Sequence, residues 1–183
     1  MALTDDLRRV ADAAIRYADA GEDLTGIVAA EPDVGRRVFL CSYTLDGQRS
    51  WLALDDERRP VERRSVVRDA ASIAALCEIA EEAAGGEGLD ELAAQLTAIR
   101  QNEVPEGVVE AEQALEELRR TLGSEPLIAS RARLDELGAA TRRLELALGE
   151  GGSPFAEAMR AGMSSVDALT DDVERHYKRP LDQ

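Results

Sequence analysis

The sequence predicts an α+β fold that is mostly α-helical. We expect an N-terminal helix and a small antiparallel β-hairpin sheet packed on a long central helix, followed by an antiparallel helical bundle. Asp46-Gly47 lies between two apolar runs, which is the pattern of a tight hairpin turn. Leucines recur at three- and four-residue spacing in the C-terminal half, as in packed helices. Aromatic residues are only 3% of the 183 residues, although 44% are hydrophobic, so Leu, Ala, Val and Ile must build the core.

The same patterns divide the chain. Residues 1–86 should form the α+β part, and residues 87–178 the helical bundle. No linker-like stretch separates them, so we expect the two parts to merge into one domain. Residues 179–183 should be a frayed tail.

The first element should be a short amphipathic helix. Thr4 is a suitable N-cap because its hydroxyl can accept a free backbone N–H. Apolar residues then recur at helical spacing as far as Ala18, and Gly21 is a natural stop. Residues 24–29 should form a strand ending at Glu31-Pro32, because a hairpin alone is marginal in water and needs a third strand.

The hairpin comes next. A two-residue type I′ turn at Asp46-Gly47 sets the register, with Phe39 opposite Leu54, Cys41 opposite Leu52, and Ser42 opposite Trp51. This register gives one mostly apolar face and one mixed face. We therefore predict a sheet packed on one side only.

Helices should fill the rest of the chain. After a link at 56–64, a helix from Val66 to Gly85 is apolar around much of its circumference, which is typical of a central helix. Narrow leucine stripes then predict helices within 89–99, from Pro105 to Gly123, and from Leu127 to Gly149. Gly149–Ser153 should be a turn, with Ser153 as the N-cap of a last helix that reaches Tyr177.

Charge and cysteine content narrow the possible partners and compartment. The formal net charge of −15 repels nucleic acid and anionic membrane surfaces, so we expect neither as a partner. The chain starts without a signal-peptide pattern and has no apolar run of roughly 20 residues, which indicates a soluble cytoplasmic protein. Two cysteines, Cys41 and Cys77, are too few for a disulfide framework and should be buried free thiols.

One group of basic residues interrupts this acidic chain. It falls where the long helix should begin, and arginine binds phosphate or carboxylate through two parallel hydrogen bonds. The group is therefore a candidate anion site, for a phosphorylated small molecule or an acidic partner segment. The alternative is local neutralisation by neighbouring Asp and Glu on a solvated face. Its members are Arg58, Arg59, Arg63, Arg64 and Arg68.

Acidic residues near the end of the long helix suggest a different chemistry. Glu78 and Glu81 are one turn apart, and with Glu82 they could hold Mg²⁺ for a hydrolase of nucleotides. All-α nucleoside triphosphate pyrophosphohydrolases also hold Mg²⁺ with a Glu-x-x-Glu helix followed by Glu-x-x-Asp. Here Glu87 and Asp90 should fall in the next loop instead of on a second helix, so we assign the chain to no family. The alternative is a solvated, charged helix end.

The only histidine, His176, lies one turn after Asp172, so the two side chains can form a hydrogen bond. A single histidine excludes multi-histidine zinc sites, and no nucleophile is near it in sequence. We interpret His176 as a helix-end residue.

These observations favour a non-enzymatic helical binding or assembly protein that acts through protein–protein contacts, as a homodimer or with a helical partner. We identify no catalytic residue and no cofactor. The first alternative is a small-ligand regulatory domain that binds an anion at the arginine group. The second is the Mg²⁺-dependent nucleotide hydrolase.

Overall fold

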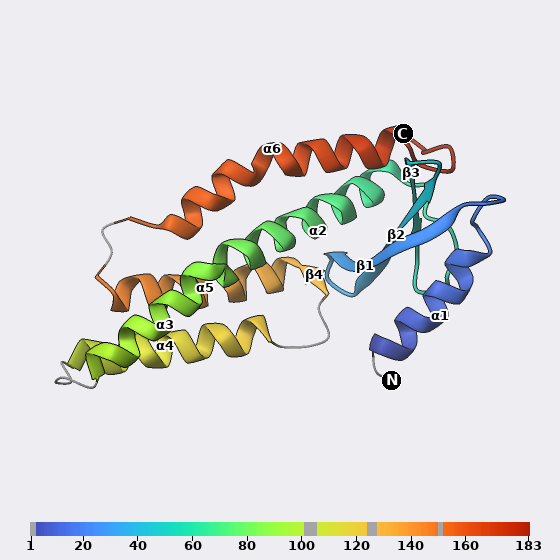
Figure 1. Cartoon of the computed structure of the whole chain (residues 1–183). Helices are drawn as coiled ribbons and strands as arrows, with labels where there is room; N and C mark the ends of the chain where they lie inside the picture. Colours follow the sequence, from blue (N-terminus) through green and yellow to red (C-terminus); the bar gives the residue numbers. More distant parts are fainter. Residues whose placement is uncertain (1–2, 101–105, 124–127, 150–151) are drawn as a thin grey trace. The chain divides into compact units, whose positions relative to one another are not determined.

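The computed structural model describes residues 3–100, 106–123, 128–149 and 152–183, without the side chains of 87–88, 99–100 and 106. The predicted helix start at Pro105 and the residues Leu127 and Gly151 lie outside this description. In chain order (Figure 1) the elements are α1 (Leu3–Ile15), β1 (Asp23–Asp33), β2 (Arg36–Leu45), β3 (Gln48–Leu54), α2 (Arg64–Gly85), α3 (Glu87–Arg100), α4 (Glu106–Leu122), β4 (Ala129–Ser130), α5 (Arg131–Ala147) and α6 (Pro154–Arg175).

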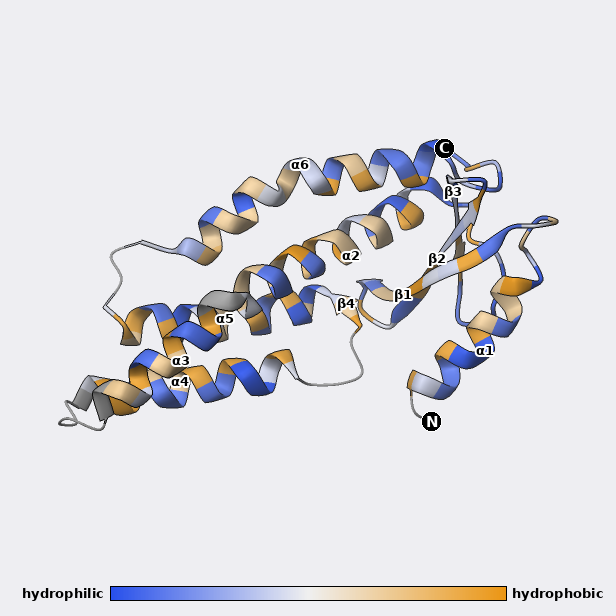
Figure 2. Cartoon of the chain, viewed as in Figure 1, coloured by the Kyte–Doolittle hydropathy of each residue, from blue (hydrophilic) through white to orange (hydrophobic). Residues whose placement is uncertain are grey.

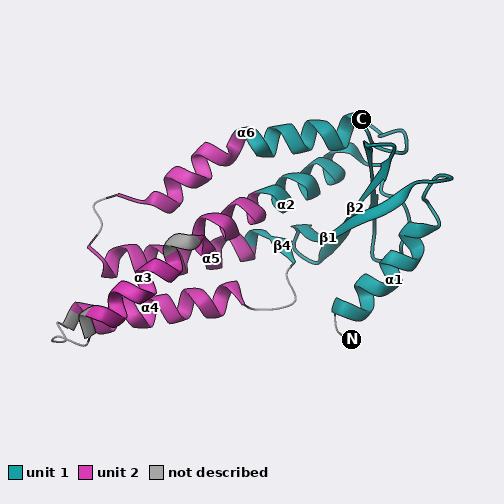
Figure 3. Cartoon of the chain, in the orientation of Figure 1, with its two compact units in different colours: residues 1–75, 126–131, 164–183 teal, residues 76–125, 132–163 magenta. Residues whose placement is uncertain are grey.

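The chain forms two compact units (Figure 3). Unit 1 comprises residues 1–75, 126–131 and 164–183, and unit 2 comprises residues 76–125 and 132–163. The fold is α+β, as the sequence predicts, with the sheet in unit 1.

The four-stranded sheet of unit 1 is mixed, with strand order β3-β2-β1-β4. Neighbours β1–β2 and β2–β3 are antiparallel. The two-residue strand β4 pairs parallel to β1, with Ala129 beside Ala30 and Ser130 beside Glu31. We expected helix to continue through this segment and an antiparallel sheet, and both expectations are wrong here. A strand of two residues carries no periodicity, so the leucine spacing around it hides it.

The predicted hairpin is confirmed residue by residue. Phe39 lies opposite Leu54, Cys41 opposite Leu52, and Ser42 opposite Trp51. Asp46 and Gly47 have φ angles of 50° and 80°, which are the positive values of a tight two-residue hairpin turn. The third strand that we expected before the hairpin is β1.

Both faces of this sheet are buried, so the prediction of a sheet packed on one side is wrong. On one face, Phe39 and Tyr43 share a core with Val10 and Ala14 of α1. On the opposite face, Leu40 and Trp51 are only 2% and 7% exposed. In Figure 1 the sheet lies between α1 and the first half of α2. The polar residues of the second face concealed this, because Ser42 bonds to Thr25 within the sheet.

Helix α1 is shorter than the sequence pattern predicts. It begins at Leu3, so Thr4 lies in its first turn instead of capping it, and it ends at Ile15. Ile15 is 59% exposed and is not a core residue. Gly21, with a φ of 85°, turns the chain toward β1 six residues after the helix ends.

The end of the chain is not frayed. Residues 176–182, which we call the C-terminal strap, follow the outer edge of β3. The backbone N–H of Trp51 donates to the His176 carbonyl at 3.0 Å, and Lys178 N–H donates to the Trp51 carbonyl at 2.9 Å. Farther on, Asp182 N–H donates to the Glu62 carbonyl at 2.8 Å, and Arg64 N–H donates to the Asp182 carbonyl at 3.2 Å.

Unit 2 is helical, and its helices share one core. Figure 2 shows hydrophilic and hydrophobic residues alternating along α4 and α5, and the hydrophobic ones supply this core. Helix α2 ends at Gly85 and Gly123 follows α4, as predicted. Ser153 caps α6 as predicted, because its hydroxyl accepts the Ala156 N–H at 3.1 Å. The buried core residues are Ala80, Ala84, Leu96, Ala111, Ala114, Leu115, Leu118, Leu137, Ala140 and Leu144.

A buried arginine ties three of these helices together. The Arg133 side chain of α5 is 7% exposed and lies 3.3 Å from a carboxylate oxygen of Glu81 on α2. Its guanidinium also donates to the carbonyls of Thr121 and Leu122, at the end of α4. Carbonyls in the last turn of a helix form its negative end, so the Arg133 guanidinium complements the end of α4.

Close packing between α2 and α6 gives a test of this core. A Cβ added at Gly162 would lie 2.7 Å from Cγ2 and 2.8 Å from Cδ1 of Ile79. We expect Gly162→Ala to lower the free energy of unfolding by about 1–2 kcal/mol, because the overlap outweighs the gain in helix propensity. Urea denaturation measures it.

The matched control is Gly138→Ala, also inside a helix, where the new Cβ would make an ordinary 3.8 Å contact with Phe155. We expect this variant to be stabilised by about 0.5–1 kcal/mol. Combining Gly162→Ala with Ile79→Ala should cost less than the sum of the single changes. Equal stability of the two glycine variants would contradict the packing described.

Candidate functional site

The five arginines singled out in the sequence do not form one site. Arg59 lies 3.2 Å from Asp55 and 3.1 Å from Glu57, which is local neutralisation. Arg68 pairs with Glu174 of α6 at 3.6 Å. Arg63 and Arg64 have exposed side chains, and their backbones pair with Asp182 of the strap.

Arg58 is directed elsewhere by a tight turn. Its N–H donates to the Asp55 carbonyl at 2.8 Å, and Asp55 N–H donates to the Arg59 carbonyl at 2.9 Å. Inside this closed turn Arg58 has a φ of 63°, the left-handed region that non-glycine residues seldom occupy. Such a conformation costs of order 1 kcal/mol and persists only where surrounding bonds enforce it.

Arg58 lines a groove with one face of α1. Three groove residues of α1, Arg9, Asp12 and Ala13, are spaced i, i+3 and i+4, which places them on the same side of the helix. Arg16 and Tyr17 follow in the turn after α1. The groove has a volume of about 700 Å³, and a smaller hollow of about 130 Å³ shares Arg9 and Arg58 with it. We call it the α1 groove; it is lined by Arg9, Asp12, Ala13, Arg16, Tyr17, Glu57 and Arg58.

The α1 groove concentrates unpaired positive charge. Arg9, Arg16 and Arg58 form no ion pair with any other residue that the structure describes. Of the acids in and beside the groove, Glu57 pairs with Arg59, and Asp6 lies 3.4 Å from Arg37. Of these acids, Asp12 and Asp56 are left to offset the positive charge of the three guanidinium groups. This local excess of positive charge lies within a chain of net charge −15.

Sequence reasoning found Arg58 but missed Arg9 and Arg16. The signal was present, because residues seven apart fall on one side of a helix. What the sequence did not give was the contact between that helix face and a loop more than 40 positions later.

The carboxylates proposed for Mg²⁺ are not gathered into a site. Within the described ranges, no three His, Cys, Asp or Glu residues are placed to hold a metal ion. Glu81 is engaged by Arg133, and Glu78 and Glu82 are exposed. Glu87 to Asp90 form the first turn of α3 and not a loop, so that part of the prediction is wrong. Asp90 pairs with Arg119 at 3.5 Å.

His176 makes the predicted bond to Asp172. Its Nδ1 is 2.9 Å from Oδ1 of Asp172, whose other oxygen accepts Trp51 Nε1–H at 2.8 Å. Burial acts to raise the pKa of Asp172, but these two hydrogen bonds outweigh it and hold the pKa below its usual value. Ser50, the neighbour of Trp51, bonds instead to Glu22. The His176–Asp172 pair therefore joins the start of the strap to α6 and to Trp51 of β3.

The two cysteines are buried and free, as predicted. Burial raises the pKa of Cys41 to about 12, so its thiol stays protonated near neutral pH.

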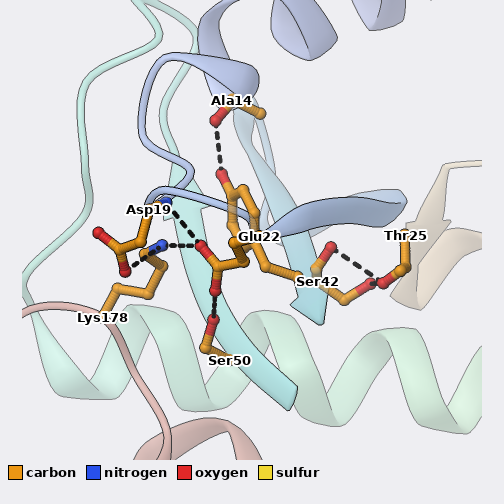
Figure 4. Close-up of polar contacts among 8 residues, drawn as sticks. Ala14, Asp19, Glu22, Thr25, Ser42, Ser50 and Lys178 are labelled. Carbon is orange, nitrogen blue, oxygen red and sulfur yellow. Dashed lines mark hydrogen bonds and ion pairs between the residues drawn. The ribbon is translucent and has the colours of Figure 1, made fainter. Parts of the chain in front are cut away.

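A second polar cluster, not foreseen from the sequence, fastens the strap (Figure 4). The Lys178 ammonium forms ion pairs with Glu22 and, at 3.0 Å, with Asp19. It also lies 4.6 Å from the centre of the Tyr43 ring, whose hydroxyl donates to the Ala14 carbonyl at 2.9 Å. The side chains of Glu22 and Lys178 are only 4% and 10% exposed. A buried pair so fully bonded is a structural fastening.

The cluster predicts a pH-dependent stability. Burial acts to raise the pKa of Glu22, but hydrogen bonds from Lys178, Ser50 and Asp19 lower it below its usual 4.5. A lowered carboxylate pKa stabilises the fold above pH 4.5 and ceases to do so as the pH falls through the folded value. We expect Glu22→Gln to cost about 2 kcal/mol at pH 7, because it breaks a buried pair, and clearly less at pH 3.

Urea denaturation at pH 7, 5 and 3, followed by fluorescence of the single Trp51, measures this difference. The control is Glu116→Gln, at an exposed position with no ion pair within the described residues. That variant should match the unmutated chain throughout. A cost for Glu22→Gln that does not change with pH would contradict the role given to the carboxylate.

Comparisons of the chain with models of protein families, with curated proteins and with solved structures return no match. Of the described helices, none combines the length and the apolar character needed to span a bilayer.

Proposed function

We propose that the chain is a non-enzymatic binding protein and that its α1 groove binds a phosphate-bearing small molecule. One observation supports this above all: three arginines that form no ion pair with any described residue line one groove of an acidic protein. Guanidinium groups bind phosphate oxygens through paired hydrogen bonds, and an unpaired group pays no cost of breaking an existing ion pair when the ligand arrives.

The local backbone supports the same proposal. The left-handed turn at Arg58 keeps this side chain apart from Arg59, whose guanidinium is already neutralised. Arg9 lies on α1 and Arg16 in the turn that follows it, so a ligand with two or more phosphate oxygens can contact both this segment and the loop that carries Arg58.

Thermal unfolding with inorganic pyrophosphate tests the proposal at constant ionic strength, with chloride as the reference anion. A bound ligand at roughly 100 times its Kd adds about 2.7 kcal/mol to the free energy of unfolding, which raises the melting temperature. We expect Arg9→Gln combined with Arg58→Gln to abolish the rise.

The matched control is Arg63→Gln combined with Arg64→Gln, which removes the same charge from the same region but not from the groove. That variant should retain the rise. If only the control variant loses the rise in melting temperature, the ligand binds at the arginine cluster predicted from the sequence and not in the α1 groove. A glutamate-rich peptide that raises the melting temperature when pyrophosphate does not would identify an acidic protein segment as the ligand. No rise with either probe would remove the proposal.

A second candidate function is assembly through the helices of unit 2, as a homodimer of the antiparallel bundle expected from the leucine stripes. Its support is an apolar surface. Leu146 is 59% exposed beside a groove of about 360 Å³ that Ala114 and Ala147 also line, and Val109 and Met163 are 42% and 44% exposed. An exposed leucine beside a groove can mark a contact with another chain. Pairing of two identical copies is the commonest form of assembly.

Sedimentation velocity tests this assembly up to high micromolar concentration. We expect a dimer that Leu146→Lys dissociates, because the charge would have to be buried in the contact. Ile15→Lys is the matched control, since Ile15 is equally exposed, at 59%, but belongs to unit 1. A strict monomer, or equal dissociation by both variants, would remove the proposal.

The Mg²⁺-dependent hydrolase gains no support from the described residues. Glu81 is bonded to Arg133, and Glu78 and Glu82 form no metal-binding group with other described carboxylates. We therefore do not propose it.

A further inference from the structure

The two edges of the sheet differ in how far other parts of the chain cover them. The β3 edge is occupied by other parts of the chain. Trp51 pairs with Tyr177, and Leu54 with Pro60. The hydroxyl of Tyr177 accepts the Ala53 N–H at 2.9 Å and donates to the Val61 carbonyl. The outward backbone groups of Trp51 and Ala53, which a β3 edge would otherwise offer to another chain, are thus satisfied within this one.

The β1 edge is open over most of its length. Strand β4 covers it only at Ala30 and Glu31. From Asp23 to Ala29, no residue in the described part of the chain pairs with the outer side of β1. Every second residue of this stretch therefore presents its N–H and C=O outward, without a strand partner in the part of the chain that the structure describes.

The composition of this edge favours pairing. Natural proteins protect an open edge with charged residues, proline or a very short strand. Between Leu24 and Ala30 the strand has no charged residue and no proline, and Ile27 and Val28 favour extended backbone. Val28 is 43% exposed, so an apolar side chain stands at this edge.

We infer that the outer edge of β1 binds an extended segment of a partner protein, which adds a strand to the sheet. The segment has an uncharged, β-branched centre and basic flanks. Acidic groups stand at both ends of the open stretch, namely exposed Asp23 and half-buried Glu31. Basic flanks complement them and the net charge of −15.

A second copy of the chain fits this edge less well. Antiparallel pairing of β1 with itself, centred on Ile27, would place Asp23 of one copy opposite Glu31 of the other. Like charges directly opposed across a sheet are destabilising. Two chains of −15 each would add long-range repulsion.

The probe for this inference is a fluorescein-labelled synthetic peptide, Lys-Thr-Val-Thr-Val-Thr-Lys. Its control is the same peptide with proline in place of the central threonine, which cannot complete a strand. Fluorescence anisotropy with the full chain should show saturable binding of the first peptide and at least about tenfold weaker binding of the second. Amide hydrogen exchange should slow in residues 24–29 when the first peptide is bound.

Substitutions test whether the peptide binds at the outer edge of β1. We expect Val28→Lys to weaken binding at least about tenfold, because it sets a positive charge beside a basic segment and protects the edge. Val34→Lys is the matched control, since Val34 is 100% exposed in the turn between β1 and β2. It should bind as the unmutated chain does. Trp51 fluorescence and urea denaturation establish that both variants are folded.

Several outcomes would overturn the inference. These are equal binding of the two peptides, unchanged binding by Val28→Lys, or exchange that does not slow in residues 24–29. Slow exchange there without peptide, increasing with protein concentration, would identify a second copy as the occupant and also overturn it. The Arg9→Gln, Arg58→Gln variant should bind the peptide normally, so this inference and the anion proposal fail separately.

Discussion

The ion pair between Lys178 and Glu22 is the interaction on which much of unit 1 depends. It joins the strap to the turn before β1, and Ser50 of β3 donates to the same carboxylate. Charges this deeply buried are tolerated only when paired and hydrogen-bonded, so the pair fixes three distant segments at once. The strap can then satisfy the backbone of Trp51, and Tyr177 that of Ala53.

The topology that covers the β3 edge of the sheet leaves most of the β1 edge uncovered by the described residues. The chain returns to the sheet twice after β3, as the strap along β3 and as β4 beside β1. The strap covers β3, but β4 has only two residues, so among the described residues the outer side of β1 has no partner from Asp23 to Ala29. An edge of seven uncharged residues beside such a short strand is unusual, because open edges of this kind invite pairing with other chains. The asymmetry is therefore a property of the topology.

The sequence predicted what is decided locally. The Asp46-Gly47 turn sets the hairpin register, and a Ser153 hydroxyl three residues before a free N–H makes an N-cap. It did not predict contacts between distant segments, such as burial of the second sheet face, the strand β4 and the strap. The arginines of the α1 groove show the same difference between local patterns and long-range contacts. Arg58 was found because basic residues cluster near it, whereas Arg9 belongs to the site only because α1 lies beside the loop after β3.

This difference between local and long-range contacts explains why the proposed anion site includes Arg58 but not the other four arginines of the predicted cluster. A run of five arginines suggests one site only if their side chains converge, and the backbone decides whether they do. The closed turn at Asp55 to Arg59 separates Arg58 from Arg59, and the start of α2 spreads the others over a helix surface, where Arg68 reaches Glu174. The left-handed backbone conformation of Arg58 costs conformational free energy, and a glycine at that position would avoid this cost. Arg58 nevertheless adopts this conformation and lines a groove with Arg9 and Arg16, which form no ion pair with other described residues, and the anion proposal is based on this combination.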